Sequence, residues 1–141
     1  MAAKDCYASQ DGPIGSECVV IDCIASGTCR QGYVALLSVA AADNDPRPTV
    51  IESDAQDSAA VVGVFAETKT TGLNVRVIKY GRAKVIVTST TPAIAVGQYV
   101  ASSNKGGAKL AATQTSADKN LGQAFQAAAT VLDEILIFVN K

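Results

Sequence analysis

Residues 73–89, "LNVRVIKYGRAKVIVTS", decide the fold class because their side chains follow a two-residue period. Val75 and Val77 alternate with other side chains before Gly81, and Val85 and Val87 do the same after it. Successive side chains of a β-strand point to opposite faces of the sheet, and a glycine inside a strand marks a bend or a break. The stretch therefore predicts two strands that are broken or bent at the glycine.

Short apolar runs separated by turn signals extend this pattern along the chain. Further strand candidates are "CVVIDCIA" (18–25), "YVALLSVA" (33–40), "AAVVGVFAE" (59–67) and "EILIFVN" (134–140). Turn-forming residues cluster in "QDGPIGS" (10–16), "DNDPRP" (43–48) and "SSNKGGAK" (102–109). This spacing predicts an all-β fold: a small β-barrel or tulip-like domain, or a sandwich, with an extended N-terminal arm and little helix. In "QAFQAAAT" (123–130) helix propensity competes with the strand pattern, so helix and strand both stay open there.

The C-terminal part of the chain weakly repeats an earlier part. "QGYVALLS" (31–38) resembles "VGQYVASS" (96–103), and aligning Gly63 with Gly122 sets Glu67 opposite Gln126. We therefore expect a β domain over 31–141 that contains a duplication of about 31–80 and 96–140. Residues 1–30 are expected to form an N-terminal arm followed by a cysteine-bearing strand.

The composition is that of a scaffold rather than of a catalyst. Of the 141 residues 48% are apolar, and there is no tryptophan and no histidine. Without histidine the chain lacks the usual general base near neutral pH and the commonest metal ligand. We expect no enzyme activity, no catalytic residue, no metal and no cofactor. No apolar run resembles a secretory signal or a membrane span, so we expect synthesis in a host cytoplasm and no membrane partner.

Acidic and basic residues are segregated along the chain. Residues 1–67 carry ten acids against three bases, whereas residues 68–117 carry seven bases and no acid. The basic segment could face nucleic acid, or it could face the acidic segment within one subunit or between copies. It lacks the aromatic side chains on which single-stranded nucleic acid stacks, so we expect no nucleic-acid partner.

A family resemblance rests on three stretches. They are "VVGVFAETKTTGLNVRVIKYGRAKVIV" (61–87), "IAVGQYVASSNKGGAKL" (94–110) and "NLGQAFQAAAT" (120–130) followed by "EILIFVN". Together they resemble the capsid cement, or decoration, proteins of tailed bacteriophages over about residues 60–140. Those proteins also have a glycine strand, a short turn, a "V-x-V" strand and a Gly/Lys-rich hairpin. Gln123 departs from the pattern, because an aliphatic residue is expected there.

The resemblance implies a structural virion protein on the outer surface of the phage head. Such a protein clamps neighbouring major capsid subunits and stabilises the shell, and it acts as an oligomer, a homotrimer first and a dimer second. The alternative is an oligomeric phage fibre or tail accessory domain, or a module that binds carbohydrate on the host surface.

Two groups of charged residues are candidates for the interface, together with the arm 1–16. The basic group consists of Arg76, Lys79, Arg82 and Lys84. The second group lies in the proline-containing loop and consists of Asp43, Asp45 and Arg47.

The four cysteines, Cys6, Cys18, Cys23 and Cys29, all lie near the N-terminus. Their spacing contains no C-x2-C pair, which argues against a structural zinc site made of four thiolates. A disulfide formed after release from the host and buried free thiols both stay open. A reactive cysteine would need a basic partner, and the usual one, histidine, is missing.

Overall fold

The computed structural model describes residues 18–115 and 118–141, and these residues form an all-β protein, as predicted. The strands in the described residues are β1 (Val19–Ala25), β2 (Val34–Val39), β3 (Thr49–Glu52), β4 (Val61–Phe65), β5 (Asn74–Ile86), β6 (Tyr99–Ser102), β7 (Ala108–Leu110), β8 (Asn120–Ala124) and β9 (Glu134–Asn140). None of the described segments forms a helix long and apolar enough to cross a membrane. The arm 1–16 and Cys6 lie outside the described residues.

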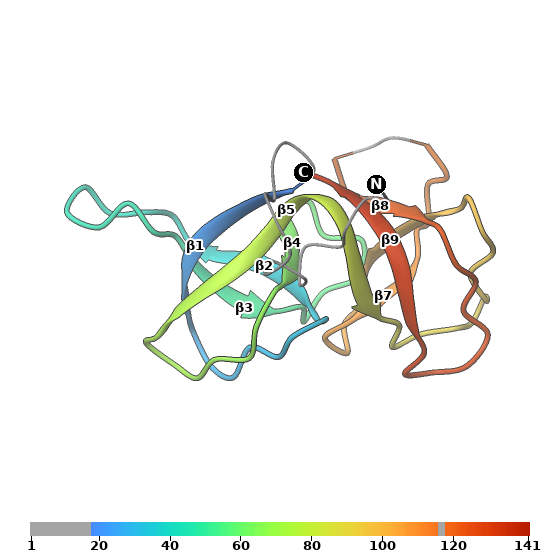
Figure 1. The fold of residues 1–141 in the computed structure, drawn as a ribbon, viewed down its shortest axis with the longest axis horizontal. Coiled ribbons are helices and arrows are strands. Elements are labelled where there is room, and N and C mark those ends of the chain that lie inside the picture. Colours follow the sequence, from blue (N-terminus) through green and yellow to red (C-terminus); the bar gives the residue numbers. More distant parts are fainter. Residues whose placement is uncertain (1–17, 116–117) are drawn as a thin grey trace, which may run out of the picture.

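The strands form two lobes that share β5 (Figure 1). The sheet order is β1-β3-β2-β4-β5-β9-β8-β6-β7, and β1 also pairs with β5. Strands β1 to β4 and the first half of β5 thus close into a barrel, which we call the N-lobe. The second half of β5 and strands β6 to β9 form the C-lobe, where Val87 bridges back to Ala108. The cysteine-bearing strand β1 is a full member of the N-lobe barrel.

Strand β5 is a single strand of 13 residues rather than two. Its first half pairs with β1 and β4, and its second half pairs with β9. Gly81 lies between the halves with a φ of +117°, a conformation that glycine adopts at little cost, and the strand bends there without breaking. The β1–β5 register also shifts so that Lys79 is passed over, as in a β-bulge.

The two lobes repeat the same backbone hydrogen bonds. The matching pairs are Cys29–Lys69 with Ile94–Ala128, Gly32–Phe65 with Gly97–Ala124, and Ala66–Arg76 with Phe125–Leu136. Gly63 and Gly122 lie at equivalent points, because a Cβ on either would come 2.0 Å from a carbonyl oxygen of the neighbouring strand. Glu67 accepts a hydrogen bond from the Arg76 amide, as Gln126 does from the Leu136 amide. Strand β8 ends at Ala124, and residues 125–130 form bends and an isolated β-bridge at Ala128 rather than a helix.

Each lobe has its own core of small side chains. The N-lobe core consists of Cys23, Ala25, Cys29, Ala35, Val50, Phe65, Val75 and Val77. The C-lobe core includes the residues at the equivalent positions, namely Val85, Val87, Ile94, Val100, Ala108, Ala124, Ile135 and Ile137. Val34, Val64 and Ile78 of the N-lobe join the C-lobe cluster, so a common apolar layer connects the lobes.

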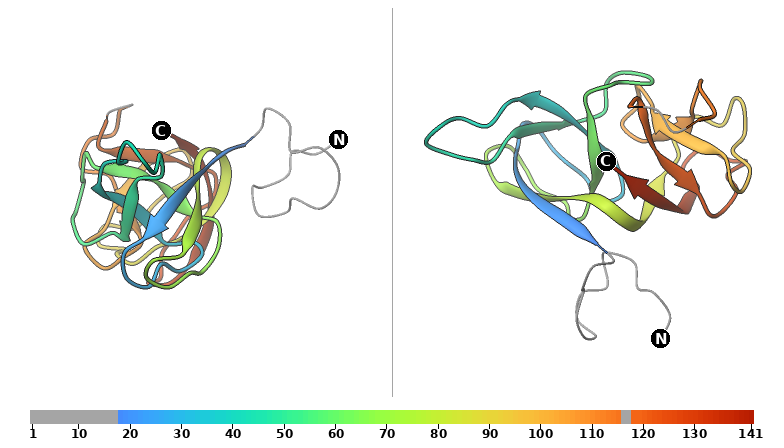
Figure 2. Two further views of the ribbon diagram at one scale, coloured as in Figure 1. Left: turned by 90° about the vertical axis from the view of Figure 1, so that its left-hand side faces the viewer. Right: turned by 90° about the horizontal axis from the view of Figure 1, so that it is seen from above.

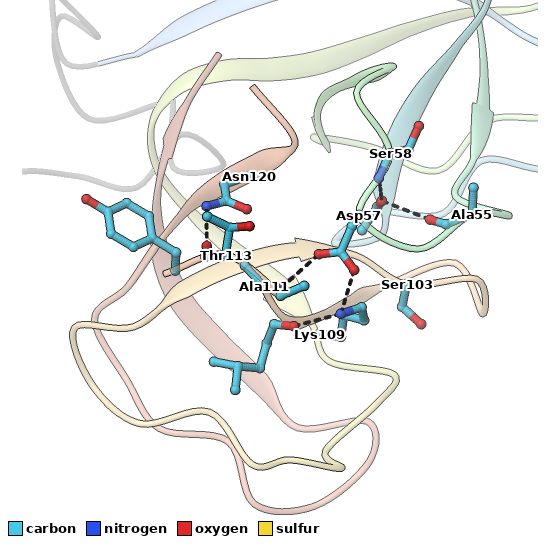
Figure 3. Close-up of polar contacts among 12 residues, drawn as sticks. Ala55, Asp57, Ser58, Ser103, Lys109, Ala111, Thr113 and Asn120 are labelled. Carbon is cyan, nitrogen blue, oxygen red and sulfur yellow. Dashed lines mark hydrogen bonds and ion pairs between the residues drawn. The ribbon is translucent and has the colours of Figure 1, made fainter. Parts of the chain in front are cut away.

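A polar contact also joins the lobes. Residues 53–60, which we call the docking loop, leave the N-lobe after β3 and lie against β6 and β7 (Figure 3). The Asp57 carboxylate accepts hydrogen bonds from the Ala112 amide at 3.0 Å and pairs with Lys109 Nζ at 2.9 Å. Ser53 Oγ donates to the Ser103 carbonyl oxygen at 2.6 Å. The lobes are therefore held as one unit by a shared strand, a shared apolar layer and the polar contacts of the docking loop.

Candidate interaction surfaces

The basic group lies along the exposed side of β5. Arg76, Lys79 and Lys84 are exposed, and Arg82 is half-buried. Arg76 Nε lies 3.4 Å from Glu67 Oε2 within the N-lobe. The bulge at Lys79 interrupts the strand alternation, so the four side chains do not follow one regular row. The structure thus places this group on one strand and pairs Arg76 internally.

Among the residues that the structure describes, two ion pairs join the acidic segment to the basic segment. Glu67 pairs with Arg76, and Asp57 pairs with Lys109, which brings together residues from either side of residue 68. These pairs match the interpretation that the two segments face one another within a subunit. Both are partly exposed, and such pairs contribute little to stability in isolation.

The second charged group lies on the hairpin between β2 and β3, whose tip projects from the end of the N-lobe (Figures 1 and 2). Asp45 and Arg47 form a bidentate pair, with Nη2–Oδ2 at 2.8 Å and Nε–Oδ1 at 3.0 Å. The hydrogen bonds from the Arg47 side chain and backbone lower the pKa of Asp45 to about 2. Arg47 Nη1 also donates to Asn74 Oδ1 on β5 at 3.3 Å. Asp45 and Arg47 therefore brace the hairpin, whereas Asp43 is exposed.

Two of the cysteines, Cys23 and Cys29, belong to the core of the N-lobe. Cys23 and Cys29 are free thiols with no exposed surface, and Cys18 is disulfide-bonded. Burial, together with Asp22 beside Cys23 and Glu52 beside Cys29, raises the pKa of each free thiol to about 11. Both therefore stay protonated at neutral pH and are poor nucleophiles and poor metal ligands. In the described part of the chain no group of three or more Cys, Asp or Glu side chains is arranged to hold a metal.

Sequence reasoning missed a set of exposed apolar side chains on the C-lobe, which we call the apolar tip. Its members are Val96 (66% exposed), Phe125 (44%), Val131 (52%) and Leu132 (62%). Segments 94–98 and 124–128 lie side by side, since Gly97 donates to the Ala124 carbonyl and Ile94 pairs with Ala128. Large apolar side chains left exposed on loops are candidates for contact with another molecule.

The N-lobe carries small or polar residues at the equivalent positions. The counterparts, in the same order, are Gln31, Ala66, Thr71 and Gly72. The clearest case is Leu132, whose amide donates to Val87 as the Gly72 amide donates to Ala25. Leu132 has a φ of +73°, a conformation that is costly for a leucine and easy for Gly72 at +87°. A residue-by-residue comparison of the two repeats would have revealed this difference from the sequence.

Comparisons with known proteins show the fold. No protein-family model matches the chain, and no curated protein does either. Among solved structures, it is similar to the head fiber gp8.5 N base in bacteriophage phi29, with a TM-score of 0.59 and 17% sequence identity. The likeness covers 87% of this chain and 94% of that one. The two chains therefore share an all-β architecture over most of their lengths.

Proposed function

We propose that this protein is a non-enzymatic structural protein of a phage virion, bound to the outer surface of the head. The observation that carries the proposal is the shared fold with a protein named as a head fiber base, over 87% of the chain. The resemblance of residues 60–140 to capsid cement proteins points in the same direction. In this proposal the protein is synthesised in the host cytoplasm and needs no cofactor, and it binds neither membrane nor nucleic acid.

The finer proposal is that each copy clamps neighbouring major capsid subunits. The hairpin tip belongs to the N-lobe and the apolar tip to the C-lobe, so one copy offers two separate contact surfaces on a unit held together by β5. A ligand that binds only the assembled shell stabilises the shell by its binding free energy. Repetition over many equivalent sites strengthens the effect without any new kind of contact.

The proposal is tested by adding the purified protein to heads that lack it and measuring binding stoichiometry and the melting of the heads. We expect a fixed number of copies per head and a higher melting temperature. The matched variant carries Val96→Gln, Val131→Thr and Leu132→Gly. Each substitution introduces the residue that the N-lobe has at the equivalent position. We expect this variant to fold and to bind heads more weakly, whereas Lys105→Ala binds normally.

Self-association is part of the proposal, with a homotrimer first and a dimer second. Light scattering on the native protein, with and without a reducing agent, tests it. A discrete oligomer that survives reduction would support a symmetric clamp. A monomer under both conditions would contradict it.

A second candidate is the base of a head fibre, which the name of the similar structure favours. The same experiment distinguishes the two functions. A fibre base would bind at few sites and leave the melting temperature of the heads unchanged, whereas a clamp would bind at many sites and raise it.

A further inference from the structure

A groove of about 390 Å³ opens on the surface of the N-lobe. Its walls include the apolar residues Leu37, Ala41, Pro48 and Val62, and Lys79 and Lys141 line it as well. None of the side chains that line the groove carries a carboxylate. Leu37 is 41% exposed, so a large aliphatic side chain on a strand is left partly uncovered by the residues that the structure describes.

The register of the strands identifies the equivalent place in the C-lobe. Leu37 pairs with Val50 between β2 and β3, as Ser102 pairs with Ala108 between β6 and β7. Since the rest of the backbone pairing also repeats, the groove beside Leu37 corresponds to the surface beside Ser102.

In the C-lobe this place is filled by the docking loop. Ser102 Oγ donates to the Ala55 carbonyl oxygen at 2.8 Å and accepts a hydrogen bond from the Ser58 amide at 3.0 Å (Figure 3). The Asp57 amide donates to the Ser102 carbonyl oxygen at 3.0 Å. Ala55 packs against the C-lobe core, and Asp57 pairs with Lys109. An apolar side chain and a carboxylate two residues later thus hold a polypeptide segment in this place.

We propose that the groove of the N-lobe binds an extended segment of a partner protein in which an aliphatic side chain is closely followed by a carboxylate. The proposal rests on the proposed function for the identity of the partner, a protein of the head. The chemistry of the segment comes from the groove and from its occupied equivalent in the C-lobe.

The groove differs from its equivalent in ways that define the segment. Leu37 stands where the C-lobe has Ser102, so the groove favours an aliphatic side chain over a polar loop backbone. Lys79 lines the groove and supplies a cation there, from a different position than in the C-lobe, because the strand register makes Ile51 the counterpart of Lys109. Across residues 18–115 and 118–141 no ion pair involves Lys79, whereas Lys141 Nζ already donates to the Asp118 carbonyl oxygen. The carboxylate of the partner is therefore matched to Lys79.

The test uses the full chain, labelled with nitrogen-15, and a capped peptide with the sequence of residues 53–60 and the change Ala55→Leu. We expect saturable shifts of the amide resonances of Ala40, Ala41 and Val62 as the peptide is added. Lys79→Glu should weaken binding by about fivefold or more, the effect of replacing one partly exposed ion pair with a repulsion. Lys105→Glu changes an exposed lysine outside the groove and should leave the affinity unchanged. A peptide that also carries Asp57→Asn should bind more weakly.

Three results would overturn the proposal. The first is the absence of a saturable shift of the amide resonances at the groove. The second is a shift at Ser102 and Ser103 instead, which would mean that the peptide displaces the docking loop. The third is a lower native mass in solution for the variant Ala41→Glu than for the unchanged protein. The last result would make a second copy of this chain the occupant. Binding to heads separates the groove proposal from the proposed function. If the Ala41→Glu variant binds heads as well as the unchanged protein does, the groove proposal is rejected and the proposed function is not. Peptide binding without any head binding would reject the proposed function alone.

Discussion

Leu132 combines an unfavourable backbone conformation with an exposed apolar side chain. At a φ of +73°, a leucine costs roughly 1–2 kcal/mol relative to an ordinary conformation, and 62% exposure leaves little burial to offset this. A position that loses stability in this way is a candidate for a contact with another molecule. The glycine at the equivalent position of the N-lobe shows that the turn itself does not require a side chain.

We predict that Leu132→Gly stabilises the isolated protein by about 1 kcal/mol, because glycine adopts a positive φ without a steric penalty. Urea denaturation measures the change, and the reverse substitution Gly72→Leu should destabilise the protein by a similar amount. A loss of stability in Leu132→Gly would mean that the leucine is held by packing rather than retained for a partner.

Gly63 is required for close approach of two strands rather than for its backbone conformation. A Cβ at Gly63 would lie 2.0 Å from the carbonyl oxygen of Ile78, a backbone atom that cannot move alone. We predict that Gly63→Ala destabilises the protein by about 3 kcal/mol, at the upper end of overpacking effects. Gly27→Ala is the control, because Gly27 has open space around it and only a φ of +92°, so about 1 kcal/mol is expected. Equal effects in denaturant titrations would contradict this account.

At the scale of the elements, the alternation in residues 73–89 was enough to predict strands but not their number. Gly81 has the sequence signature of a break, and only the pairing of β5 with β1, β4 and β9 decides that the chain bends and continues. That pairing joins residues far apart in the sequence, and the alternation within one stretch does not report such contacts. The docking loop was missed for the same reason, since Asp57 gains its role from Lys109 and Ala112 in the other lobe.

The docking loop gives the protein a specific sensitivity to acid. Burial tends to raise the pKa of Asp57, but the hydrogen bonds from the Ala112 amide and from Lys109 outweigh it, and the pKa is lowered overall. A carboxyl group with a lowered folded-state pKa contributes stability that is present above its unfolded value, near 3.9, and lost as the pH falls through its folded-state value.

We therefore predict that Asp57→Asn lowers the free energy of unfolding by about 1 kcal/mol at pH 7, a value reduced for partial exposure. The difference between this variant and the native protein should shrink below pH 4. Asp43→Asn, at the exposed hairpin tip, is the control. A constant difference across the acid range would contradict the assigned role of the Asp57 carboxylate.

At the scale of the whole molecule, the two lobes are expected to unfold together. They share β5 and the apolar layer that includes Val64 and Ile78. We predict one cooperative transition, and Phe65→Ala in the N-lobe core should destabilise the protein by about 3–4 kcal/mol. Hydrogen exchange at Val100 in the C-lobe should report the same loss of protection. Two separate transitions would mean that the lobes are independent.

The proposed function follows from the sequence less directly than the fold does. The absence of histidine and the scaffold composition favour a structural role, and the family resemblance favours the phage head. The charged groups singled out in the sequence include Arg76, Asp45 and Arg47, which the structure pairs internally. Exposure and internal pairing depend on tertiary contacts, so the groove became visible only in the folded protein, whereas a comparison of the two repeats would have pointed to the apolar tip.

The most direct test of the central claim is electron cryo-microscopy of heads to which the purified protein has been added. We predict that the protein lies on the outer surface of the head and that each bound copy contacts more than one major capsid subunit, one of them through the apolar tip. Density that touches a single subunit, or no bound protein at saturating concentration, would contradict the account of this chain as a clamp of the phage head.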